Sequence, residues 1–425
     1  MDKFVINGGN RLEGDVTVSG SKNSALPILA AALLAEGQTI LRNVPDLEDI
    51  VAMIDLLRSL GCEIRREGAD LFVEVHDETN SHAEYDRVRK MRASVCVLGP
   101  LLAKRKRARV AMPGGCAIGS RPVDLHMRGL RLLGANIHLD SGDMVATAPV
   151  LRGAEIFLGG PFGSTVLGTD NVMMAATLAE GTTVIECAAC EPEVGDLANF
   201  LNRMGAKITG AGTPRITIQG VPRLTGCDHT VIPDRIEAGT FMMAAAITNG
   251  EITLHNVTLD HMLAVVDRLR EVGVVVERRN GSVRVSSAGQ PRPTDVTTQT
   301  YPGFPTDMQA QLMSLLCLAD GNSAITEKIF PDRFMHVAEL LRMGCEIRKE
   351  GPTAIVKGVK KLIGAPVMAS DLRASAALVI AGLVASGQTT INRVYHIDRG
   401  YENIEVKLRG LGADIQRVND KRVSE

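Results

Sequence analysis

Six short segments, spread along the whole chain, share one pattern: an apolar residue, a glycine, two variable residues and a second apolar residue. The intervals between successive glycines of this pattern are 73, 71, 68, 71 and 68 residues. Such regular spacing indicates internal repeats, each of which folds as one structural unit. The chain is therefore predicted to contain six units of about 70 residues. The repeated glycines are Gly61, Gly134, Gly205, Gly273, Gly344 and Gly412.

The first unit shows the predicted order of elements. An apolar stretch at 25–35 is followed by a turn at Gly37, a short strand at 39–41 and an amphipathic helix that ends at Gly61. One face of this helix carries Ile50, Ile54, Leu57 and Leu60. Their spacing of four and three residues is helical, and a glycine can supply the left-handed residue that ends a helix. The turn glycine recurs in every unit except the second, as Gly181, Gly250, Gly321 and Gly387.

The apolar stretch of each unit is predicted to be a buried helix. The stretches at 173–176 and 242–246 contain only Met and Ala, and such small side chains allow close packing. A chain of 425 residues exceeds the size at which a single hydrophobic core stops growing, so two domains are the first expectation and a single large barrel is the second. We expect two domains of three units, with helices inside and sheets outside, and residues 4–6 completing a sheet of the C-terminal domain.

The predicted domains are residues 21–230, and residues 1–20 together with 231–425. Prolines and polar residues make 221–233 a plausible linker between them. Charged residues in the cleft between the domains would then hold a ligand.

Composition excludes several classes of function. The formal net charge is −2, and the basic run at 104–107 has no continuation, which is unlike a nucleic-acid-binding surface. Aromatic residues make up only 3% of the chain, so stacking on bases or sugars is not expected. The first residues lack a charged segment followed by an apolar one, so we expect a cytoplasmic protein without membrane insertion. The eight cysteines are scattered, as expected for thiols in a reducing compartment.

The second unit departs from the repeat. Between its strand and its amphipathic helix it inserts residues 113–121, a glycine-rich stretch that contains Cys116 and ends at Arg121. The fold evidently does not require this insertion, because five units lack it. Arg121 is close enough in sequence to lower the pKa of the Cys116 thiol, so Cys116 is a candidate reactive residue; an unreactive loop thiol is the alternative. The pair Cys187 and Cys190 invites a metal or redox interpretation, but no second such pair exists, and we expect no metal.

The chain resembles the enolpyruvyl transferase family, and in particular the members that act on UDP-N-acetylglucosamine, from Met1 to about Arg417. The matching motifs are Gly20–Pro27, Lys90–Ser94, Pro113–His126, Phe304–Ala310, Asp371–Ser375 and Tyr395–Glu402. The resemblance implies an inside-out α/β barrel of two threefold domains. It also implies a transferase of peptidoglycan synthesis, which moves the enolpyruvyl group of phosphoenolpyruvate to a 3'-hydroxyl and releases phosphate, without a cofactor.

The resemblance also implies roles for individual residues. Phosphoenolpyruvate would be bound by Lys22, Asn23, Arg121, Arg373 and Arg399. Asp307 would be the general base, although its place after a proline also suits a helix cap. Cys116 would be the acid and the target of fosfomycin, and Lys22 and Arg399 also count as catalytic. UDP-N-acetylglucosamine would contact Asn23, Arg92, Arg121, Pro122, Val123, Asp124, Leu125, Thr165, Val166, Asp307 and Ile329.

One segment departs from the family pattern. Residues 165–169 read Thr-Val-Leu-Gly-Thr, where relatives usually carry Ser-Val-Gly-Ala-Thr. Two other enolpyruvyl transferases remain alternatives. The shikimate enzyme has no such cysteine loop, and the nucleoside enzymes act on a different acceptor. A third alternative, a ring-shaped clamp on DNA, needs a positive inner surface that this composition does not favour. The sequence leaves the oligomeric state open.

Overall fold

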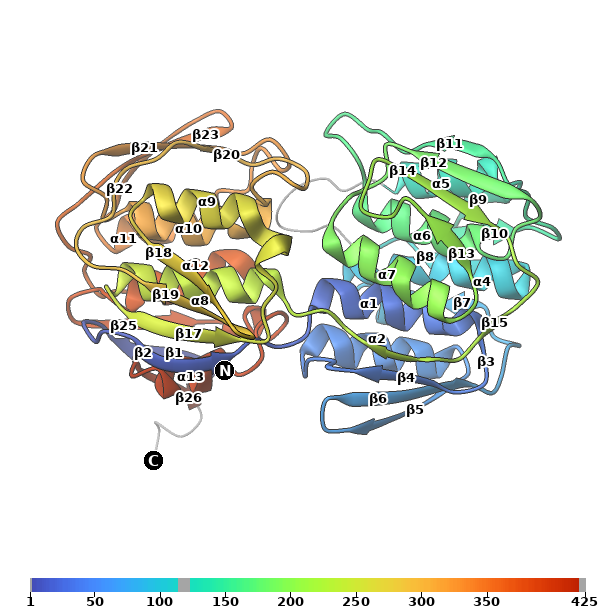
Figure 1. Ribbon diagram of the computed structural model, residues 1–425, viewed down its shortest axis with the longest axis horizontal. Coiled ribbons are helices and arrows are strands. Elements are labelled where there is room, and N and C mark those ends of the chain that lie inside the picture. The colour runs from blue at the N-terminus through green and yellow to red at the C-terminus, as the bar shows by residue number, and fades with distance from the viewer. Residues whose placement is uncertain (1, 114–122, 420–425) are drawn as a thin grey trace. The chain divides into compact units, whose positions relative to one another are not determined.

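The computed structural model describes residues 2–113 and 123–419. Contacts divide the chain into two compact units: a middle unit from Gly20 to Ile232, and a terminal unit that combines the residues up to Ser19 with those from Pro233 onward. Each unit has its own hydrophobic core of buried aliphatic side chains. In each unit the most apolar helices lie inside and the sheets lie outside, as Figure 1 shows. The predicted mixed α/β fold is confirmed.

The described residues form six four-stranded sheets with one strand pattern. In each sheet an edge strand runs parallel to its neighbour, and the two remaining strands are antiparallel. The middle unit contains β16 (Asp228–Thr230), β4 (Thr39–Arg42), β6 (Asp70–Val75) and β5 (Cys62–Glu67); β7 (His82–Ala83), β8 (Arg107–Ala111), β10 (Asp143–Thr147) and β9 (Asn136–Asp140); β11 (Glu155–Phe157), β12 (Thr182–Glu186), β14 (Arg215–Gln219) and β13 (Lys207–Thr209); and the small pair β15 (Leu224–Thr225) and β3 (Ala35–Glu36).

The terminal unit repeats this arrangement in three sheets. They are β2 (Glu13–Thr17), β17 (Glu251–His255), β19 (Ser282–Ser286) and β18 (Val275–Arg279); β20 (Val296–Thr297), β21 (Asn322–Thr326), β23 (Thr353–Lys357) and β22 (Glu346–Glu350); and β24 (Pro366–Met368), β25 (Gln388–Asn392), β1 (Asp2–Asn7) and β26 (Asp414–Asn419). Buried side chains alternate with half-buried or exposed ones along β17 and its equivalents, because one face of each sheet covers the core.

In four sheets the parallel edge strand leads into a buried helix, which leads into the central strand of the same sheet. The other two edge strands are exchanged: β2 leads through α1 into β4 but pairs with β17, and β16 leads through α8 into β17 but pairs with β4. The buried helices are α1 (Lys22–Ala31), α4 (Leu98–Arg105), α6 (Val166–Ala176), α8 (Arg235–Ile247), α10 (Gln309–Leu316) and α12 (Leu372–Gly382). The amphipathic helices that follow are α2 (Glu48–Ser59), α5 (Asp124–Leu132), α7 (Pro192–Arg203), α9 (Leu263–Glu271), α11 (His336–Arg342) and α13 (Ile404–Gly410). Short elements complete the list: α3 (Tyr85–Val88), η1 (Ala32–Leu34), η2 (Arg92–Val97), η3 (Leu259–Met262), η4 (Thr306–Met308) and η5 (Val394–His396).

The repeat glycines end the amphipathic helices, as predicted. All six have a positive φ, between 86° and 107°. This left-handed conformation is costly for residues with a Cβ and normal for glycine at a helix end. In the second unit, which lacks the turn glycine, Lys106 takes the left-handed position after α4 with φ 61°. The repeat therefore reflects a backbone requirement.

The N-terminal strand β1 completes a sheet of the terminal unit, as expected from the circular order of the repeats. It lies between β25 and β26, with Phe4 opposite Ile391 and Arg417.

The two units divide between Ile232 and Pro233, inside the stretch 221–233 where the break was predicted, but most of this stretch is not a linker. This stretch contributes β15 and β16, and His229 of β16 is only 3% exposed. These strands have two and three residues, which is too short for an alternating pattern to be recognised in the sequence.

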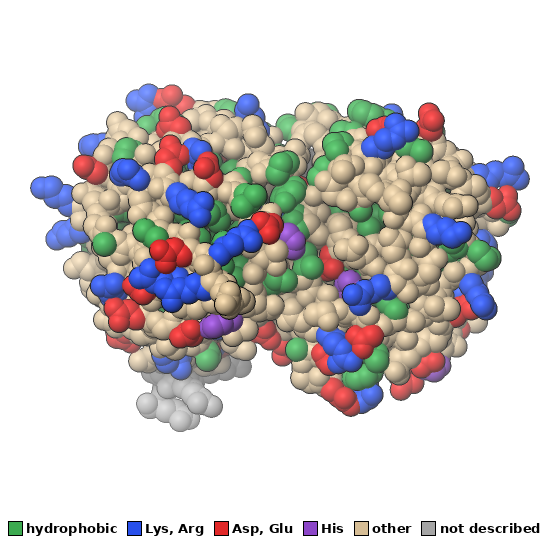
Figure 2. Space-filling view, in the orientation of Figure 1, with side chains coloured by type: hydrophobic (Ala, Val, Ile, Leu, Met, Phe, Trp, Pro, Cys, Tyr) green, Lys and Arg blue, Asp and Glu red, His purple; other side chains and the backbone are tan. Residues whose placement is uncertain are grey.

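The described residues show two further properties, one of the surface and one of the helices. On the face shown in Figure 2, Lys and Arg side chains lie interspersed with Asp and Glu side chains on each unit. No helix in the described part of the chain combines the length and the apolar character that a membrane span needs.

Candidate active site

Asp307 lies in η4, directly before the buried helix α10. Its two carboxylate oxygens face two arginines of the terminal unit. Arg333 Nη1 donates to Oδ1 at 2.8 Å, and Arg373 Nη2 lies 3.6 Å from Oδ2. The Asp307 side chain is 29% exposed, whereas the two arginine side chains are 8% and 2% exposed. Asp307 lies inside η4, and the N-cap residues of η4 and α10 are Pro305 and Met308, so the helix-cap alternative is not supported.

Arg373 is a buried cation with unused hydrogen-bonding capacity. It is the second residue of α12, which begins after Asp371; the Asp371 side chain accepts from the N–H groups of Arg373 and Ala374 at 2.8 and 3.0 Å. Among the described residues, Arg373 Nε and Nη1 have no hydrogen-bond partner. A buried donor without a partner is costly, and an anionic ligand would reduce that cost.

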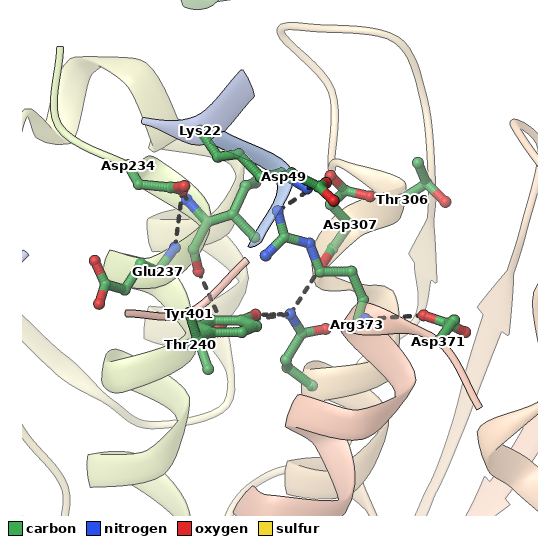
Figure 3. Close-up of polar contacts among 12 residues, drawn as sticks. Lys22, Asp49, Asp234, Glu237, Thr240, Thr306, Asp307, Asp371, Arg373 and Tyr401 are labelled. Atoms are coloured by element: carbon green, nitrogen blue, oxygen red, sulfur yellow. Dashed lines mark hydrogen bonds and ion pairs between the residues drawn. The ribbon is translucent and has the colours of Figure 1, made fainter. Parts of the chain in front are cut away.

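An aromatic platform supports Arg373. The guanidinium carbon lies 5.2 Å from the centre of the Tyr401 ring. The Tyr401 hydroxyl is 2.9 Å from Thr240 Oγ1 and accepts from Gln311 Nε2 at 3.1 Å. Burial raises the pKa of Tyr401, so its hydroxyl keeps its proton at neutral pH. Figure 3 shows Asp307, Arg373, Tyr401 and Thr240 together.

The other predicted residues of the terminal unit lie in loops beside these elements. Ile329 follows β21 and is half-buried, and its N–H donates to Glu327 at 2.9 Å. Arg399 follows η5 and is also half-buried. Its charge adds to the effect of burial, which is the main cause, in lowering the pKa of His396.

In the middle unit, Lys22 and Asn23 open the buried helix α1. Lys22 is 8% exposed, and its Nζ donates to Asp49 Oδ2 at 3.0 Å (Figure 3). Asp49 lies in the first turn of α2 and is itself buried. The sequence analysis did not identify Asp49, because the spacing of apolar residues in α2 gives no information about its polar positions.

The remaining predicted residues of the middle unit lie at helix starts. Arg92 opens η2, and buried Val123 precedes α5, of which exposed Asp124 and half-buried Leu125 are the first residues. Thr165 caps α6 by accepting from Gly168 N at 3.2 Å, and Val166 is the first helical residue.

The departure at 165–169 is accommodated within α6. Leu167 packs against the hydrophobic core of the middle unit. Gly168 stands where relatives usually carry Ala, and Thr165 stands where they carry Ser. A Cβ at Gly168 would lie 2.4 Å from Thr165 Cγ2, so the two changes fit each other.

Cys116, Arg121 and Pro122 lie outside the described residues, so their predicted roles stay predictions. Cys187 and Cys190 are free thiols, and burial followed by the nearby Glu191 charge raises the pKa of Cys190. No group of three or more His, Cys, Asp or Glu residues in the described ranges is arranged to bind a metal ion.

Asn171 of α6 is a fully buried residue that sequence reasoning missed. Its Nδ2 donates to Val95 O at 2.9 Å and lies 2.9 Å from His126 Nδ1, and its Oδ1 accepts from Gly99 N at 2.8 Å. Asn171 thus joins α5, which carries Asp124 and Leu125, to the segment that begins at Arg92. No pattern in the sequence indicates such contacts.

Comparisons with known proteins agree with this arrangement. Residues 6–408 match the family described as EPSP synthase (3-phosphoshikimate 1-carboxyvinyltransferase). Two relatives named UDP-N-acetylglucosamine 1-carboxyvinyltransferase are close in sequence. The one from Methylacidiphilum infernorum is 55% identical over 99% of this chain and 100% of its own. The one from Solidesulfovibrio magneticus is 57% identical over 98% and 100%.

A solved structure extends the comparison to the fold. The enolpyruvyl transferase NikO from Streptomyces tendae superimposes with a TM-score of 0.89 at 26% identity, covering 98% of this chain and 99% of that chain. The chain belongs to the enolpyruvyl transferase family, in the branch of the UDP-N-acetylglucosamine 1-carboxyvinyltransferases.

Proposed function

We propose that this protein transfers the enolpyruvyl group of phosphoenolpyruvate to the 3'-hydroxyl of UDP-N-acetylglucosamine and releases phosphate, the first committed step of peptidoglycan synthesis. The observation that carries the proposal is the 55–57% identity, over almost the whole chain, to relatives of that name. Both substrates are water-soluble anions, which supports the expectation that the reaction takes place in the cytoplasm.

Asp307 is proposed to take the proton of the 3'-hydroxyl as its oxygen attacks the central carbon of phosphoenolpyruvate. The position between Arg333 and Arg373 supports this role, because two arginines fix the orientation of the carboxylate. One positioned general base contributes about 10²-fold to 10⁴-fold in rate.

Phosphoenolpyruvate carries a phosphate and a carboxylate, so several fixed cations are needed. Arg373, Arg399, Lys22 and Arg121 are proposed for this role, with Asn23 as a polar contact. The unpartnered donors of buried Arg373 support it, since planar arginine donors suit carboxylate and phosphate oxygens.

Cys116 is proposed to donate its proton to the methylene carbon, which completes addition across the double bond. The tetrahedral intermediate then loses phosphate and one methyl proton, which restores the double bond of the enolpyruvyl ether. The nucleotide sugar is proposed to contact Arg92, the residues at 121–125, Thr165, Val166 and Ile329.

Phosphate release with three acceptors tests the proposal. We expect release with phosphoenolpyruvate and UDP-N-acetylglucosamine, and none with shikimate 3-phosphate. UMP is the third acceptor, because the nucleoside enolpyruvyl transferases are the alternative that acts on a different acceptor. Release with only shikimate 3-phosphate or only UMP would overturn the proposed acceptor.

A further inference from the structure

Glu327 is a buried carboxylate that accepts hydrogen bonds from four groups. It directly follows β21 and is 0% exposed. Its Oε1 accepts from Thr298 Oγ1 at 2.6 Å and from the N–H groups of Ile329 and Phe330 at 2.9 and 3.0 Å, and its Oε2 accepts from Thr306 Oγ1 at 2.9 Å. Among the described residues, no Lys, Arg or His forms an ion pair with it. A buried charge needs such hydrogen bonds.

Comparison with the other repeat units shows which of the Glu327 hydrogen bonds belongs to the shared fold. In four units the residue after the central parallel strand has a positive φ: Asn43, Cys187, Asn256 and Arg393. Asn43 and Asn256 donate to the backbone carbonyl that follows the parallel edge strand, Val231 O at 2.9 Å and Val18 O at 2.7 Å. The bond between Glu327 and Thr298 is the equivalent link in the fifth unit, because Thr298 follows β20.

The bonds from Glu327 to Thr306, Ile329 and Phe330 go beyond that shared link. The hydroxyl of Thr306 has one proton, which it donates to Glu327, so it accepts from Arg333 Nη1 at 3.0 Å. The same Arg333 nitrogen donates to Asp307 Oδ1 at 2.8 Å. A chain of directed hydrogen bonds therefore runs from Glu327 to the proposed base.

We propose that Glu327 is a positioning residue for the transfer reaction. Through Thr306 and Arg333 it orients the Asp307 carboxylate. Through the two backbone amides it fixes the segment at Ile329. One side chain therefore positions both the proposed base and a proposed contact to the nucleotide sugar. The inference rests on the proposed function, in which Asp307 accepts the 3'-hydroxyl proton and Ile329 contacts the nucleotide sugar.

Steady-state kinetics of the full-length protein test this inference. Thr306→Val removes the hydroxyl that joins Glu327 to Arg333. It should lower kcat by about 10-fold to 100-fold, because Arg333 loses a hydrogen bond that orients it toward Asp307. The KM for phosphoenolpyruvate should change little. Thr306→Ser, which keeps the hydroxyl, should restore most of the loss. Glu327→Gln should lower kcat and also raise the KM for UDP-N-acetylglucosamine.

Asn256→Gly is the matched control. It removes the equivalent link in the fourth unit, and glycine tolerates the φ of 53° there. We expect its kcat and both KM values to match those of the unmodified protein. The combined variant Thr306→Val with Glu327→Gln should lose less kcat than the product of the two single losses, because both act on one chain of bonds.

Two results would overturn the inference: equal kcat for Thr306→Val and Thr306→Ser, or the same kinetic changes in Asn256→Gly as in Glu327→Gln. Circular dichroism at the assay temperature separates both from unfolding. If the unmodified protein releases no phosphate with UDP-N-acetylglucosamine, the proposed function fails instead, and the two failures are thereby distinguished.

Discussion

Single residues of the candidate site differ in how far the sequence identifies them. Asp307 and Arg373 lie in motifs that resemble those of the family, and both were predicted. Arg333 and Glu327 belong to the same hydrogen-bond network as Asp307 but were not predicted, since these contacts join residues 21 to 29 positions apart in the chain. Motifs identify the residues that contact the substrate more readily than the residues that orient those side chains.

At Asp307, we expect Asp307→Asn to lower kcat by about 10²-fold to 10⁴-fold, because an amide cannot accept the 3'-hydroxyl proton. The side chain has nearly the same size, so substrate binding should change less than kcat. The measurement is phosphate release at saturating substrate. An exposed acid, Asp267, provides the control, and Asp267→Asn should retain full activity. Unchanged kcat for Asp307→Asn would remove Asp307 as the base.

At Cys116, we expect fosfomycin to add one molecule per chain and abolish activity. Two of the described thiols compete poorly, because burial raises the pKa of Cys62 to about 12 and that of Cys227 to about 11. Intact-protein mass spectrometry before and after incubation measures the addition. Cys116→Ser should show no added mass, while Cys227→Ser should react like the unmodified protein. Unchanged mass and activity of the unmodified protein would contradict an accessible nucleophile at Cys116.

At the scale of elements, the helix ends explain the repeat. Gly205 follows α7 with a φ of 107°, and its N–H donates to Asn202 O at 3.0 Å. Gly195 lies inside the same helix. A Cβ at either position meets nothing within 4 Å, so the two glycines differ in backbone conformation and not in available space.

Replacing these two glycines should therefore have opposite effects on stability. Gly205→Ala should lower the free energy of unfolding by about 1–2 kcal/mol, because alanine is strained at positive φ. Gly195→Ala should raise it by roughly 0.5–1 kcal/mol, since alanine favours the helix. Urea-induced unfolding followed by circular dichroism measures both. Equal effects of the two substitutions would show that the left-handed conformation is not what the repeat conserves.

At the scale of the whole molecule, buried ionisable groups couple folding to pH. His336 of α11 is fully buried, and burial lowers its pKa from the usual value to about 4. The unfolded chain binds a proton at His336 below about pH 6.5, whereas the folded chain does so only near pH 4. Stability is therefore lost as the pH falls through this window, by roughly 3 kcal/mol in total.

Replacing His336 should flatten this pH dependence. Among the described residues, its Nε2 has no hydrogen-bond partner, so His336→Leu loses no bond at that atom. We expect the free energy of unfolding of His336→Leu to fall less than that of the unmodified protein between pH 7 and pH 4.5. The exposed His138 is the control, and His138→Gln should follow the unmodified protein. Parallel pH curves for His336→Leu and the unmodified protein would refute the assignment.

The sequence by itself determined the six units, the helix ends, the closing of a sheet by β1 and the family. These features depend on local backbone geometry and on the spacing of apolar residues, which recur visibly when a unit is repeated. Only the tertiary structure decided that β16 pairs with β4 and that β2 pairs with β17, each far away in the chain. It likewise decided which polar groups surround Asp307 and Asn171. Such contacts are set by the packing of distant segments, and short strands and single polar side chains leave no periodic pattern from which to predict them.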